Sequence, residues 1–98
     1  MEKSRPLLVL SPSGLSSLRL RIICPITGWK PHFERNPWLI KVQPDDANHL
    51  GKISAIDAFQ VRCISLNRLS KKIGELDRET VARVAKAVAV CVGLQIKV

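Results

Sequence analysis

RPLLVLSP at residues 5–12 and IICPITG at residues 22–28 are the two segments that decide the fold of this chain. In each, an apolar run lies beside a polar residue able to contact phosphate, Arg5 in the first and Thr27 in the second. A continuous apolar run such as residues 7–10 is typical of a strand covered on both faces. Residues 18–23 alternate leucine or isoleucine with arginine, which predicts a half-buried strand that continues towards Thr27.

The rest of the chain predicts a small sheet with one terminal helix. Further strands are predicted over residues 38–42, 53–63 and 71–75, with a single helical turn within residues 65–70. Asp77 can cap a helix in which apolar residues recur at helical spacing until Gly93. Five strands and one helix predict a mainly β (α+β) fold, in which the helix packs against a strongly curved antiparallel sheet.

Length and charge limit the classes of partner. Ninety-eight residues make a single domain, and 46% hydrophobic with 24% charged residues is a globular composition. Sixteen Lys and Arg against eight Asp and Glu give a formal charge of +8. Because such a surface attracts polyanions, nucleic acid is the first candidate partner, and an anionic membrane surface or an acidic protein remains open.

No apolar stretch approaches the roughly 20 residues that span a bilayer, and the first residues lack the apolar core of a signal peptide. We therefore expect a cytoplasmic protein without a membrane partner. Cys24, Cys63 and Cys91 are odd in number and match neither C-x-x-C nor zinc spacing, which favours buried, reduced thiols and no metal site.

Together with FQVR at residues 59–62 and the helix after Asp77, the two opening segments resemble the MazF/PemK family of bacterial toxins. The match in order runs from Arg5 to about Leu94, so residues 1–98 form one MazF/PemK-like domain. The resemblance implies a small SH3-like antiparallel barrel with a C-terminal helix (CcdB/MazF-like) that forms a homodimer. It also implies the toxin of a type II toxin–antitoxin system, a sequence-specific endoribonuclease that cleaves single-stranded mRNA without metal or cofactor. Its other partner would be an acidic antitoxin.

The resemblance carries the family's catalytic pair over to Arg5 and Thr27. Arg5 would stabilise the transition state and take part in proton transfer, while Thr27 would position the scissile phosphate. Guanidinium and hydroxyl groups suit this chemistry because both donate hydrogen bonds to phosphate oxygens. On spacing alone, however, Arg5 could be a solvated charge and Thr27 an ordinary strand-end residue.

Gln60 and Arg62 match the family's acid-Gln-apolar-Arg string, and the resemblance places that Gln towards substrate or the dimer partner. Phe59 stands where the family has its acidic residue, and Asp57 is the nearest substitute. Asp57 could act on the substrate, or its carboxylate could be satisfied by backbone or by arginine.

Residues 28–37 form a long connection that mixes aromatic and basic side chains. Trp29, Lys30 and His32 are candidate RNA-binding residues there, since single-stranded RNA is held by stacking on aromatic rings and by charge. Equally, Trp29 and Phe33 could fill a small core, and a lone loop histidine often has no function.

The chain departs from the family at its start, because only four residues precede Arg5. Family members usually carry a further strand and loop there, so the resemblance implies that both are missing. This leaves an alternative: a non-catalytic relative that titrates antitoxin, or a CcdB-like gyrase-binding protein. The Arg5 and Thr27 pair favours the nuclease over the gyrase poison, whereas the missing strand and loop favour the inactive relative.

Overall fold

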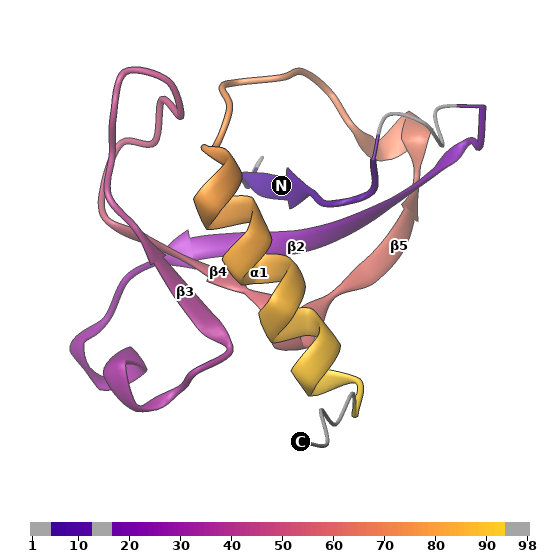
Figure 1. Ribbon diagram of the computed structural model, residues 1–98. Helices are drawn as coiled ribbons and strands as arrows, with labels where there is room; N and C mark the ends of the chain where they lie inside the picture. Colours follow the sequence, from indigo (N-terminus) through magenta and orange to yellow (C-terminus); the bar gives the residue numbers. More distant parts are fainter. Residues whose placement is uncertain (1–4, 13–16, 94–98) are drawn as a thin grey trace.

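The computed structural model describes residues 5–12 and 17–93, which form an antiparallel sheet of five strands with one C-terminal helix (Figure 1). The strands are β1 (Leu7–Val9), β2 (Leu20–Gly28), β3 (Leu39–Val42), β4 (Ser54–Asp57) and β5 (Arg62–Ser65), and the helix is α1 (Arg78–Cys91). Short 3-10 turns are η2 (Pro31–Arg35), η3 (Ala58–Gln60) and η4 (Leu66–Arg68). This arrangement confirms the predicted fold class, mainly β with a C-terminal helix.

The nine-residue strand β2 organises the sheet, because three other strands pair with it. Ile23 lies opposite both Val9 of β1 and Arg62 of β5, so these two strands run along opposite edges of β2. Further along, β2 pairs with β4, which in turn pairs with β3. The half of β2 that contains Thr27 therefore pairs with β4, which carries β3. The other half of β2 pairs with β1 on one edge and with β5 on the other.

Alternation along β2 separates two chemically different faces of the sheet. Cys24 and Ile26 point to the side that α1 covers and belong to the buried core, with Ile40, Val42, Ile56 and Val84. The alternate residues Ile23, Pro25 and Thr27 point to the opposite side, which α1 does not cover (Figure 1). The face under α1 supplies the main buried cluster, whereas on the other face Ile23 is buried and Thr27 is exposed and available for a site.

The limits of α1 are those predicted from the sequence. The Asp77 carboxylate accepts hydrogen bonds from the backbone N–H of Thr80 at 3.3 Å and from its hydroxyl at 2.5 Å, which caps the helix. Gly93 follows the helix with φ of 91°, a left-handed conformation that glycine adopts at low cost. Within the described part of the chain, α1 is too short and too polar to cross a membrane.

Two predicted strands are wrong. Residues 53–63 do not form one strand, because Asp57 accepts a hydrogen bond from the backbone N–H of Phe59 and so starts η3 between β4 and β5. Residues 71–75 form no ladder; the backbone N–H of Glu75 donates instead to the carbonyl of Ala47 in a loop. The predicted helical turn within residues 65–70 is confirmed as η4.

The prediction of three buried thiols holds fully only for Cys24. Cys91 is partly buried and Cys63 is exposed, because Cys63 pairs with Ile22 on the part of the sheet that α1 leaves uncovered. All three are free thiols. The expectation of a missing strand and loop ahead of Arg5, and the family match beyond Gly93, concern positions outside the described residues.

Candidate functional site

A groove of about 600 Å³ lies on the face of the sheet opposite α1. Its walls come from both halves of the sheet and from the connection between β2 and β3. The polar lining residues are Arg5, Thr27, Asn36, Asp57, Gln60 and Arg62, and the apolar ones include Leu7, Ile23, Phe33, Trp38 and Leu39. Four of the seven residues proposed from the sequence, Arg5, Thr27, Gln60 and Arg62, therefore line one groove.

Strand pairing explains why Arg5 and Thr27 converge. Leu7 lies opposite Pro25, and the carbonyl of Pro6 accepts a hydrogen bond from the backbone N–H of Ile26 at 3.1 Å. If this register continues, Pro6 lies opposite Ile26 and Arg5 lies opposite Thr27. Because opposed residues of antiparallel strands point to the same face, both side chains reach the groove, and both are exposed to solvent.

Arg62 reaches the groove in the same way, since it lies opposite Ile23 on β2. Neither it nor Arg5 forms an ion pair with any described residue; the pairs present are Lys41–Glu34 and Lys72–Glu75. The groove therefore holds two guanidinium groups against the single carboxylate of Asp57. Such a lining attracts an anion.

The Asp57 carboxylate is engaged by its own turn. Its Oδ1 accepts a hydrogen bond from the backbone N–H of Phe59 at 3.0 Å, and its Oδ2 accepts one from Nε2 of Gln60 at 2.9 Å. Two alternatives were open for Asp57, and the structure shows the second: the backbone N–H of Phe59 satisfies the carboxylate. Its other hydrogen-bond partner is the side chain of Gln60 and not an arginine.

Trp29, Lys30 and His32 do not line the groove. The rings of Trp29 and His32 instead lie edge-on to Phe33, with centroids 5.6 and 4.8 Å away. The ammonium of Lys41 lies 5.0 Å from the centre of the Trp29 ring. Phe33 belongs both to this aromatic cluster and to the groove lining, so the cluster lies beside the groove and outside the buried core.

The structure adds Asn36 and Trp38 to the groove. From the sequence, Trp38 is predicted only to begin a strand, and nothing in the pattern around Asn36 distinguishes it from other loop residues. Their positions depend on the path of the connection between β2 and β3, which contains η2 and the hydrogen bond from the backbone N–H of Leu39 to the carbonyl of Asn36.

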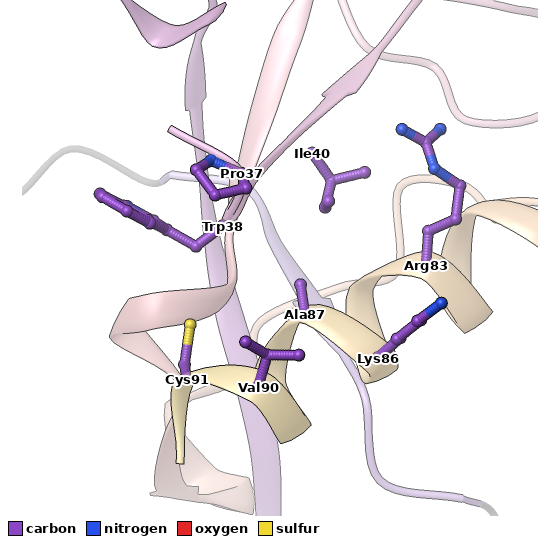
Figure 2. Close-up of a pocket in the computed structure, with 8 residues that line it drawn as sticks. All are labelled: Pro37, Trp38, Ile40, Arg83, Lys86, Ala87, Val90 and Cys91. Atoms are coloured by element: carbon purple, nitrogen blue, oxygen red, sulfur yellow. The ribbon is translucent and has the colours of Figure 1, made fainter. Parts of the chain in front are cut away.

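A smaller crevice of about 250 Å³ lies between α1 and the start of β3 (Figure 2). Figure 2 shows Arg83 and Lys86 at one end, Trp38 and Cys91 at the other, and Ala87 and Val90 between them. The crevice contains no residue proposed from the sequence. Among residues 5–12 and 17–93, no group of three or more His, Cys, Asp and Glu is placed to hold a metal ion.

Residues 1–92 match the model of a family described as the PemK-like, MazF-like toxin of type II toxin–antitoxin systems. Among solved structures, the fold is similar to that of the Mycobacterium tuberculosis toxin MazF-mt6. The TM-score is 0.80 at 22% identity, covering 98% of this chain and 93% of that one. It is also similar to MazE–MazF of Deinococcus radiodurans, with a TM-score of 0.74 at 25% identity, covering 93% of this chain and 84% of that one. The comparison with curated proteins gave no match.

Proposed function

The chain belongs to the PemK-like, MazF-like toxin family of type II toxin–antitoxin systems, and we propose that it is a metal-independent endoribonuclease that cleaves single-stranded mRNA at a specific sequence. One observation carries the proposal beyond family membership. Arg5, which precedes β1, and Thr27 of β2 both line a groove that also contains Arg62, and this supports the proposal. A guanidinium and a hydroxyl on one face can bind the same phosphate.

The proposed reaction is attack of a ribose 2′-oxygen on the adjacent phosphorus. The 2′-OH loses its proton, the phosphorane gains negative charge, and the 5′-oxygen leaves with a proton. Arg5 offsets the charge and takes part in proton transfer, while the Thr27 hydroxyl donates to a phosphate oxygen. The products are a 2′,3′-cyclic phosphate and a 5′-OH.

The remaining predicted residues have binding roles in this proposal. Gln60 and Arg62 contact RNA within the groove, next to the aromatic side chains of Phe33 and Trp38. Trp29, Lys30 and His32 lie beside the groove, where single-stranded RNA leaving it would pass over a partly basic, aromatic surface.

The test is cleavage of single-stranded RNA in the presence of EDTA by the wild-type protein and by Arg5→Ala. We expect discrete fragments ending in 2′,3′-cyclic phosphate from the wild type. For Arg5→Ala we expect a cleavage rate that is lower by a factor of at least about 100. Since Arg5 is exposed, the melting temperature should be unchanged. Arg68→Ala is the matched control, because Arg68 is exposed and lies outside the groove.

Equal cleavage by wild type and Arg5→Ala would remove Arg5 from the mechanism. If RNA stays intact with the wild type, the non-catalytic alternative is favoured. Binding assays then distinguish its two versions: a relative that titrates antitoxin binds the acidic antitoxin, and a CcdB-like protein binds gyrase.

We also propose that the protein acts in the cytoplasm, pairs with an acidic antitoxin and forms a homodimer. The charge of +8 suits an acidic partner, and the Deinococcus radiodurans structures contain MazE together with MazF. The homodimer is supported by apolar side chains at the uncovered end of the sheet. Leu20 and Ile22 are 52% and 42% exposed on the face that elsewhere forms the core.

A further inference from the structure

Helix α1 carries two stripes of side chains, and the buried core lies under one of them. Val84 and Val88 belong to the core stripe. The second stripe lines the crevice between α1 and β3, and its members follow the spacing i, i+3, i+4, i+7 and i+8 of one helical face: Arg83, Lys86, Ala87, Val90 and Cys91 (Figure 2). The core therefore leaves this second stripe open at the surface.

The chemistry of the crevice changes along its length. Arg83 and Lys86 mark one end, and neither forms an ion pair with a described residue. Towards the other end the lining is apolar, and it includes Trp38 and Val90, which is 62% exposed. Because a helix rises about 1.5 Å per residue, Val90 lies about 10 Å along the axis from Arg83 and about 6 Å from Lys86. A fitting ligand therefore carries negative charge at this distance from an apolar group.

The size and lining of the crevice exclude several kinds of occupant. Its volume of about 250 Å³ is below the range of roughly 300–1,000 Å³ that is typical of pockets for drug-sized ligands. RNA could pair with the two cations, but its polar base edges would lose water against the apolar walls. A second copy of the chain, related by a two-fold axis, would bring the same two cations against this face. An acidic protein segment with one apolar side chain suits both ends.

We infer that the crevice is a docking site for an acidic segment of a partner protein. One apolar side chain of the segment packs against Trp38 and Val90, and its carboxylates pair with Arg83 and Lys86. This inference rests on the proposed pairing with an acidic partner, and it names the surface that holds that partner. A single anchor side chain beside a charged rim is a common way for a protein segment to be recognised.

The test is an NMR titration of the ¹⁵N-labelled protein with a short acidic peptide. The peptide has two adjacent glutamates and a leucine three residues later, among serine and glycine, which places leucine about 10 Å from a carboxylate in an extended chain. We expect shifts of the amide signals of residues 83–91 and of the Trp38 indole, with a dissociation constant in the millimolar range. Replacing the leucine by alanine, or both glutamates by glutamine, should weaken binding about fivefold.

Two variants of the protein test the two ends of the crevice, each with a matched control. Val90→Ser and Lys86→Glu should each weaken binding of the peptide about fivefold. Val92→Ser and Arg78→Glu make the same kinds of change at exposed positions of α1 or its C-cap outside the crevice, so both should bind as the wild type does. All four positions are exposed, and the amide signals of the core should therefore stay in place.

No shift within residues 83–91, or equal weakening by a variant and its control, would overturn the inference. Shifts of these α1 amides with a uridine hexamer alone would overturn it in favour of RNA, and shifts on dilution of the protein alone would do so in favour of a second copy. If a complete acidic antitoxin binds while the peptide leaves the crevice unshifted, the proposed partner stands and this docking site is wrong. The expected pattern in a protein that leaves RNA intact would support the site while the proposed nuclease activity fails.

Discussion

Among the described residues, Cys24 has the largest shift of pKa on folding. Its side chain is fully buried between the sheet and α1, and burial raises the pKa of the thiol from 9.0 to about 11. The charges of Asp57 and Cys91 raise this pKa further, as smaller contributions. The folded protein therefore holds the Cys24 proton more tightly than the unfolded chain does.

We predict that Cys24 makes folding sensitive to alkaline pH. Since the folded pKa lies above the unfolded value, the contribution is complete below pH 9 and is lost as pH rises towards 11. Two pKa units correspond to about 2–3 kcal/mol of unfolding free energy. Urea unfolding at several pH values between about 8 and 11 should therefore show a steeper decline of the unfolding free energy for the wild type than for Cys24→Ala.

Cys63→Ala is the control for that measurement, because Cys63 is exposed, and it should decline with pH as the wild type does. Lysines also ionise in this pH range, but all three proteins contain the same lysines. Their contribution therefore cancels when the unfolding free energies of two proteins are subtracted. Parallel curves for wild type and Cys24→Ala would contradict the prediction.

At the scale of single residues, the sequence located part of the groove. Arg5 and Thr27 are predicted from the resemblance of their segments to the toxin family, because the spacing alone fits a solvated charge and an ordinary strand-end residue equally well. Asn36 and Trp38 are not predicted from the sequence, because their places depend on the path of the connection between β2 and β3, which contains η2. The orientation of Gln60 depends on a turn that interrupts a predicted strand.

At the scale of elements, the sequence succeeded where a pattern repeats over several residues. The helix was identified with its cap and its end because helical spacing persists over four turns. The strand prediction for residues 71–75 is wrong, because this short segment packs against a loop instead of pairing with a strand. That loop is built around buried Asn48, whose Oδ1 accepts from the backbone N–H groups of Asp45 and Leu50 and whose Nδ2 donates to the carbonyl of Gln43.

The contact between these two segments predicts the effect of Gly74→Ala. A Cβ atom at Gly74 would lie 2.5 Å from the carbonyl oxygens of Ala47 and Asn48, and both atoms belong to a backbone held by hydrogen bonds. We expect Gly74→Ala to lower the unfolding free energy by about 2–3 kcal/mol, measured by urea denaturation.

Gly51→Ala is its matched control. A Cβ at Gly51 meets nothing within 4 Å and its φ lies outside the left-handed region, so stability should stay the same or rise by about 0.5 kcal/mol. If Gly74→Ala were as stable as Gly51→Ala, the packing of residues 71–75 on the loop would be wrong.

At the scale of the whole molecule, α1 covers only part of the apolar face of the sheet. It packs over Cys24, Ile26 and Ile56, whereas further along β2 the same face exposes Leu20 and Ile22. Ile22 lies opposite exposed Cys63 on β5. We name Leu20, Ile22 and Cys63 the open strip. A monomer in water would leave these side chains hydrated, and a second copy of the chain placed against them would bury them.

We therefore predict that the double variant Leu20→Lys with Ile22→Lys is a monomer, and that the wild type is a dimer in sedimentation velocity. Two lysines on each open strip would place like charges against each other across a two-fold interface. The fold should persist, as judged by circular dichroism, because both positions are exposed in the single chain. Ile73→Lys is the control, since Ile73 is 46% exposed and lies outside the strip, and it should remain dimeric. A wild type that sediments as a monomer would refute the homodimer, and a double variant that stays dimeric would place the interface elsewhere.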